Sequence, residues 1–321
     1  MQITWLPEQP VHGTLFRIRL TQLPPDLAVI TGTVAGEPVH FGPARGDTIE
    51  ALAAAPLDHG PVLDLPLVLT RTSGAVDTLH ASVPITQGTY RLERLTVAPR
   101  FGAPPDSATA ARIAREQQRA RAVARAAHET PRLWREVVPP RASRITSGFG
   151  SGREFNGQVQ SRHTGTDFAG AVGAPVRAAA RGVVALVGNF YLAGRVIYID
   201  HGGGLVTGYF HLSRQLVAPG DTVDAGQTIG RVGATGRVTG PHLHWVVRYG
   251  GITVNPMSFV EVAKTLNGPE TETERGYGDG DETPSRLRLP LRLRKTLAIA
   301  RLWPAFATIP NISDRVRVLL C

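Results

Sequence analysis

Two pairs of residues in the second half of the chain have spacings that suit a metal ion. His163 precedes Asp167 by four positions, and a glycine and two threonines nearby disfavour a helix, so we expect a turn beside a strand. His242 and His244 flank Leu243. On a strand, alternate side chains share one face, so both imidazoles would face the same site. Two converging imidazoles are costly to bury without a partner, and the partner that we predict is a metal.

Zinc suits this set of donors. Two neutral imidazoles and one carboxylate give three protein ligands and leave a fourth position for water, which is typical of a catalytic rather than a structural zinc site. The spacing leaves open which histidine of the second pair binds the metal. His211 could be a spare ligand or an acid–base group, whereas His201, in Asp200-His-Gly202, is expected to be structural.

The elements around these residues are predicted to be mostly β. Residues 1–100 contain short apolar-patterned strands separated by Pro, Gly and Asp, which suggests a β-sandwich accessory domain. Residues 101–140 form a linker with a helix from Ala108 to about His128, capped by Asp106 or Ser107. Residues 141–265 are glycine-rich β, and residues 266–321 are a tail that we expect to be mostly disordered, with an amphipathic surface anchor as the alternative.

Composition and charge narrow the function classes. The chain has 321 residues and a net charge of +9, carried almost entirely by arginine. No nucleic-acid motif accompanies this charge, so we expect no nucleic-acid partner. An anionic polymer such as a bacterial cell wall would fit the charge, and so would a surface of solvated arginines. The one cysteine, Cys321, cannot form an internal disulfide.

No transmembrane segment is predicted, because no apolar run approaches the ~20 residues that a spanning helix needs. The first residues show neither the charged region nor the apolar core of a signal peptide. If the protein acts outside the cytoplasm, we therefore expect its leader to be truncated or removed.

Several runs of the second half resemble the lysostaphin/LytM-type zinc metalloendopeptidases, a family of peptidoglycan hydrolases. They occur in the family's order and cover about residues 141–260. The matching runs are Ser147-Gly-Phe-Gly150, His163-Thr-Gly-Thr-Asp-Phe168, Gly173-Ala-Pro-Val-Arg-Ala178, Gly182-Val-Val184, Tyr209-Phe-His-Leu-Ser213, Gly220-Asp-Thr-Val-Asp-Ala-Gly-Gln-Thr-Ile-Gly230, Gly233-Ala-Thr-Gly236, Gly240-Pro-His-Leu-His-Trp245 and Asn255-Pro256.

The resemblance implies a role for each matched residue. His163, Asp167 and His244 match the family's zinc ligands, and His211 and His242 match its two catalytic histidines that do not bind the metal. It also implies an antiparallel-β LytM-type peptidase domain that cuts peptidoglycan peptides in the periplasm or outside the cell. The N-terminal region resembles the immunoglobulin-like domain that accompanies some of these peptidases, and we expect it to position or regulate the peptidase without adding chemistry.

Two other functions compete with hydrolysis. Relatives that have lost ligands only activate other wall hydrolases, but all five functional residues are present here, which favours the enzyme. Val217–Gly230 also resembles a run of biotinyl and lipoyl carrier domains. Those domains need a lysine on a hairpin, and this chain has none before Lys264. The sequence leaves open which peptide bond is cut and which of His211 and His242 is the base.

Overall fold

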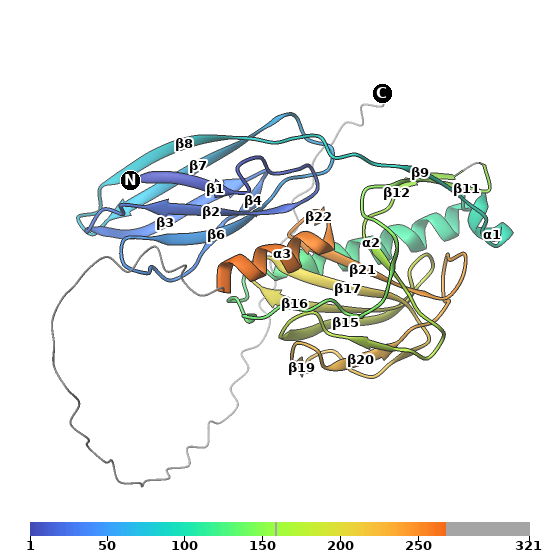
Figure 1. Cartoon of the computed structure of the whole chain (residues 1–321). Helices are drawn as coiled ribbons and strands as arrows, with labels where there is room; N and C mark the ends of the chain where they lie inside the picture. Colours follow the sequence, from blue (N-terminus) through green and yellow to red (C-terminus); the bar gives the residue numbers. More distant parts are fainter. Residues whose placement is uncertain (158, 268–321) are drawn as a thin grey trace, which may run out of the picture. The chain divides into compact units, whose positions relative to one another are not determined.

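Residues 1–157 and 159–267 are described by a computed structural model (Figure 1). The described part is mostly β, as predicted, and it lies within one compact unit. Disorder or a surface anchor was predicted for residues 266–321. Apart from the end of the last helix, these residues lie outside the described part of the chain. Within the described part, no helix combines the length and the hydrophobicity needed to cross a bilayer.

The N-terminal region consists of two four-stranded sheets around one core. The first sheet has the order β1 (Gln2–Leu6), β2 (Leu15–Thr21), β6 (Ile49–Ala54), β5 (His40–Phe41), and the second β4 (Glu37–Pro38), β3 (Leu27–Val34), β7 (Val62–Arg71), β8 (Val76–Pro84). Alternate apolar residues of β2 and β7, such as Ile18 and Leu65, are fully buried in this core. Residues of both sheets share this core, while the β-sandwich and its immunoglobulin-like character stay predictions.

The linking helix lies close to where the sequence predicted it. After β9 (Leu92–Leu95) and α1 (Pro99–Gly102), helix α2 spans Ser107–Ala126. The Asp106 carboxylate accepts a hydrogen bond from the backbone N–H of Thr109 at 2.7 Å and so caps the helix. Ala120 and Ala124 are buried, whereas most of the helix's arginines face solvent.

An eight-stranded antiparallel sheet forms the centre of the C-terminal half. Its order is β10 (Ile145–Ser147), β13 (Thr166–Ala169), β21 (His242–Tyr249), β17 (Leu205–Leu212), β16 (Gly194–Gly202), β15 (Gly182–Phe190), β19 (Thr222–Val223), with β22 (Ile252–Val254) paired to β21. A three-stranded sheet joins β14 (Pro175–Arg177), β20 (Thr228–Arg231) and β18 (Arg214–Gln215). Helix α3 (Pro256–Asn267) follows and contacts β21 and β2 (Figure 1).

Strand β9 pairs across the predicted domain boundary at residue 100. It pairs in parallel with β11 (Gly152–Phe155), which pairs in turn with β12 (Val159–Arg162). In this register Glu93 lies opposite Arg153. Residues that the sequence assigned to the accessory domain therefore form part of a sheet with residues of the peptidase region.

His201 is buried in a chain of hydrogen bonds, which agrees with its predicted structural role. Its Nδ1 donates to the Arg181 carbonyl at 2.8 Å, so Nε2 accepts from the Thr207 hydroxyl at 2.7 Å. That hydroxyl lies 3.0 Å from the hydroxyl of Tyr209. Burial, which outweighs the opposing effect of the Arg181 carbonyl, lowers the pKa of His201 to about 4.

This lowered pKa predicts a loss of stability in acid. The unfolded chain binds the proton near its ordinary pKa of about 6.5 and the folded chain only near 4, so stability is complete above pH 6.5 and declines as the pH falls towards 4. The loss should reach roughly 3 kcal/mol for this one group. Denaturant unfolding of metal-free protein between pH 7 and pH 4 measures it. The His201→Gln variant should be less stable at pH 7 but should show a shallower pH slope, and an unchanged slope would contradict the assignment.

Candidate active site

Three buried side chains converge in an arrangement that could hold a metal ion. The donor atoms of His163, Asp167 and His244 all lie within 4.8 Å of one another. His163 Nε2 is 3.0 Å from His244 Nδ1 and 3.1 Å from Asp167 Oδ1, and the other two atoms are 2.7 Å apart. Ligand atoms around a tetrahedral zinc ion, with bonds of about 2.0–2.1 Å, are separated by roughly 3.3 Å. The triangle of donors is thus close to the size that the ion requires.

The strand register brings two of these residues together. In the antiparallel pairing of β13 with β21, Asp167 lies directly opposite His244. His163 lies before β13, outside any helix, as the sequence predicted. Gly165 makes this approach possible, because a Cβ there would lie 2.5 Å from the Trp245 carbonyl oxygen and 2.7 Å from a ring carbon of His244. Only glycine lets the two segments come this close.

Hydrogen bonds orient the His163 ring for metal binding. Its Nδ1 lies 2.7 Å from the Gly148 carbonyl oxygen. Because a carbonyl can only accept, Nδ1 carries the hydrogen, and in the neutral ring the lone pair is then on Nε2, which faces the centre. Metal-binding histidines are commonly held in this way by a bond from their other nitrogen.

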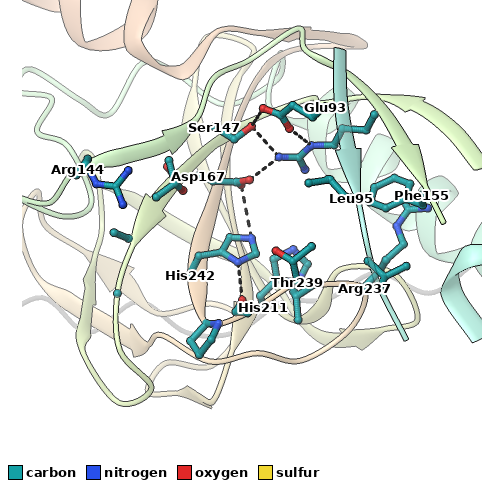
Figure 2. A pocket seen from close by; sticks show the side chains of 18 residues that line it. Glu93, Leu95, Arg144, Ser147, Phe155, Asp167, His211, Arg237, Thr239 and His242 are labelled. Carbon is teal, nitrogen blue, oxygen red and sulfur yellow. Dashed lines mark hydrogen bonds and ion pairs between the residues drawn. The ribbon is translucent and has the colours of Figure 1, made fainter. Parts of the chain in front are cut away.

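His211 and His242 lie beside the three donors, of which Figure 2 shows Asp167. Their ring centroids are 4.9 Å apart, and that of His211 is 5.8 Å from the His244 ring. The Nδ1 atoms of His211 and His242 each lie 2.8 Å from a carbonyl oxygen, of Thr235 and Gly240 respectively. Both rings therefore donate through Nδ1, which leaves Nε2 free to accept a proton. His242 Nε2 is 3.7 Å from Asp167 Oδ1.

The backbone at His211 is strained. Its φ of 63° lies in the left-handed region, where residues other than glycine lose roughly 1–3 kcal/mol. The backbone N–H of His211 donates to the Ala193 carbonyl at 2.9 Å, and the ring bond to Thr235 fixes the side chain. Such strain persists only where the surroundings enforce it, and it is concentrated at functional sites.

The electrostatics keep the site in the protonation states that a metal requires. Burial raises the pKa of Asp167, but the adjacent side chains of His163 and His244 outweigh burial and hold the pKa well below its ordinary value. Burial, then repulsion from His242 and His244, places the pKa of His211 well below 6.5, and burial lowers that of His244 to about 4. At neutral pH the carboxylate is charged and these two imidazoles are neutral.

The structure adds a charged network that sequence reasoning missed. Arg153 Nη2 lies 2.6 Å from Asp167 Oδ2, the oxygen that faces away from the imidazoles, and Arg153 Nε lies 3.0 Å from Glu93 Oε2. The Ser147 hydroxyl donates to Glu93 Oε1 at 2.6 Å (Figure 2). No spacing links Glu93 to Arg153 in the sequence, and their contact depends on the β9–β11 pairing.

A groove with a volume of ≈ 400 Å³ opens over this site. Glu93 and Leu95 of β9 lie in one wall, and residues 237–242 lie in another. Its wall also includes Arg144 and Arg237, which Figure 2 shows on opposite sides of Asp167. Of the six residues singled out from the sequence, the structure gathers His163, Asp167, His211, His242 and His244 here, and places His201 elsewhere in the core.

Comparisons with known proteins agree on one family. The profile of Peptidase family M23 matches residues 161–256. The chain is 43% identical over 134 residues to the peptidoglycan DD-endopeptidase ShyC of Vibrio cholerae serotype O1, a match that covers 40% of this chain and 30% of ShyC. It is 44% identical over 122 residues to the DD-carboxypeptidase/endopeptidase Mpg of Neisseria meningitidis serogroup B, covering 38% of this chain and 28% of Mpg.

These two relatives are thus matched over less than a third of their own length. A crystal structure assigned to peptidase M23 from Pseudomonas aeruginosa is similar over a larger part of this chain. It is 28% identical, with a TM-score of 0.61, and the match covers 79% of this chain and 96% of that one. The similarity therefore extends well beyond residues 161–256.

Proposed function

We propose that the chain is a zinc-dependent metalloendopeptidase of the kind grouped in Peptidase family M23, whose profile matches residues 161–256, and that it hydrolyses peptide bonds in peptidoglycan stem or cross-link peptides. The observation that carries the proposal is the buried triangle of donor atoms from His163, Asp167 and His244, with two further imidazoles beside it. The relatives named DD-endopeptidases support the choice of substrate.

In this proposal His163 Nε2, Asp167 Oδ1 and His244 Nδ1 hold the zinc ion. Their two nitrogens and one oxygen, their burial and the fixed tautomer of His163 all suit zinc. When bound, zinc would polarise the scissile carbonyl and favour deprotonation of a water molecule. Arg153 holds Asp167 Oδ2, so the carboxylate keeps its other oxygen directed at the imidazoles.

His211 and His242 move protons in the proposed reaction. Each holds its Nδ1 hydrogen on a backbone carbonyl, so only Nε2 remains to exchange a proton with water or substrate. One of them accepts the proton of the attacking water, and the other stabilises the oxyanion or protonates the leaving amine. His211 is the more deeply buried of the two, while the His242 side chain is 16% exposed and lines the groove.

We propose that the protein acts in the periplasm or outside the cell, because that is where its substrate lies. Its net charge of +9 would favour contact with an anionic wall. The first 100 residues are proposed to position or regulate the peptidase, with Glu93 reaching the groove through β9.

The test is hydrolysis of a purified cross-linked peptide dimer by the full chain. Zinc-loaded protein should release monomers, each cleavage adding one new amino terminus and one new carboxyl terminus. A chelator should abolish the reaction, and stoichiometric zinc should restore it. Equal activity after the chelator has removed all metal would sink the proposal, as would a loaded protein that cleaves no cross-linked peptide.

A further inference from the structure

The groove contains more arginines than its carboxylates pair with. Three arginines and two carboxylates line it, namely Arg144, Arg153, Arg237, Glu93 and Asp167. Arg153 contacts both carboxylates, at 3.0 and 2.6 Å. Among residues 1–157 and 159–267, no hydrogen bond or ion pair is made by the guanidinium of Arg144 or of Arg237. Two cations therefore remain to face whatever enters the groove.

Arg237 is the better placed of the two to bind a ligand. Its guanidinium lies 3.9 Å from the centroid of the Phe155 ring and is half-buried, whereas Arg144 is exposed. Burial, and secondly the charge of Arg153, lowers the pKa of Arg237 to about 10, so it stays protonated at neutral pH. A partly buried cation without an anionic partner is costly, and a carboxylate would remove that cost.

The loop around Arg237 is fixed before any ligand binds. The backbone N–H of Arg237 donates to the Leu192 carbonyl at 2.8 Å. Thr235, two residues earlier, donates from its hydroxyl to the Leu212 carbonyl at 3.0 Å, and its own carbonyl accepts from His211 Nδ1. The same loop therefore positions both His211 and Arg237, so a ligand on Arg237 lies at a defined place relative to the reacting groups.

We propose that Arg237 forms a carboxylate-binding subsite of the groove, which selects acidic peptides by pairing with a free carboxylate near the scissile bond. The planar guanidinium can bind a carboxylate through two parallel hydrogen bonds, while its other face rests on Phe155. This subsite rests on the proposed function, because it assigns part of the same groove to the same class of substrate.

The test measures binding of tetrapeptides ending in D-alanine that carry a side-chain and a C-terminal carboxylate. Each carboxylate is converted in turn to a carboxamide, and calorimetry with the zinc-loaded full chain gives Kd for each peptide. One amidation should weaken binding ~10–100-fold, the range for a hydrogen-bonded charge. This difference should vanish in Arg237→Gln and be reduced in Arg237→Lys. It should persist in the matched control Arg94→Gln, which removes an exposed arginine of β9 that lies outside the groove.

Removing the metal shows whether the zinc ion or Arg237 is the cation that binds the carboxylate. If Arg237 is responsible, the preference for the free carboxylate remains in chelator-treated protein, whereas a preference that disappears with the metal overturns the proposal. Equal Kd values for all peptides in the wild-type chain, or a preference that survives in Arg237→Gln, would also overturn it. Hydrolysis of the cross-linked dimer by the same preparation, without any carboxylate preference, would leave the proposed function standing and reject the subsite alone.

Discussion

Replacing His244 by alanine removes the metal ion from the protein and abolishes hydrolysis. His244 Nδ1 lies 2.7 and 3.0 Å from the other two donors, so its loss leaves only two ligands for the ion. Substitutions that only support a ligand typically cost 10–100-fold in metal affinity, and we expect the loss of a ligand itself to exceed ~100-fold. Metal content after dialysis, measured by plasma mass spectrometry, checks the expectation.

The matched control is His80→Ala, which removes an exposed histidine of the N-terminal region. It should retain one metal ion per chain and full activity. Thermal unfolding shows whether the His244 variant still folds, because the imidazole also stacks on Phe210 with centroids 5.3 Å apart. A folded His244→Ala protein with its full complement of metal would refute the assignment of this ligand.

Replacing His211 or His242 by alanine should leave the metal in place and still remove most of the turnover. Neither side chain belongs to the group of three donors, yet both rings adjoin it. Loss of an acid–base group typically lowers the rate ~10²–10⁴-fold. The measurement pairs kcat with metal content for each variant, and only kcat should change.

The double variant adds a second criterion. If the two histidines serve the same chemical step, their losses are not additive, and the double variant should be little slower than the slower single variant. Loss of stoichiometric metal from either single variant would show that ligand and catalyst had been exchanged. Wild-type turnover in His211→Ala would leave the strained backbone at that residue without a catalytic explanation.

Local sequence patterns predict the direction of side chains well where a regular strand alone determines the geometry. The alternation in His242-Leu-His244 correctly indicated that both rings face one site, with Leu243 buried on the other side. The same pattern could not choose between the two rings. That choice depends on the register of β13 against β21, which sets Asp167 opposite His244 and Ala169 opposite His242.

Contacts between distant segments were beyond the reach of the sequence. The Arg153–Glu93 pair joins residues 60 positions apart, and it forms only because β9 adds to β11. One arginine in an arginine-rich chain carries no local signal of such a role. Arg237 is a similar case, since its place beside Phe155 depends on the path of the loop before β21. The pairing of β9 with β11 across the predicted boundary at residue 100 likewise depends on contacts between distant segments.

The most direct test of peptidoglycan hydrolysis is mass spectrometry of the fragments that the zinc-loaded full chain releases from purified peptidoglycan. We expect cross-linked dimers to give way to monomers that each carry a new terminus at a peptide bond, with every glycan bond intact. Chelator-treated protein should release none of them. Cleavage confined to glycan bonds would contradict a peptidase. So would a loaded chain that releases nothing by itself and only accelerates a second hydrolase, because that result would identify a wall-binding activator instead of an enzyme.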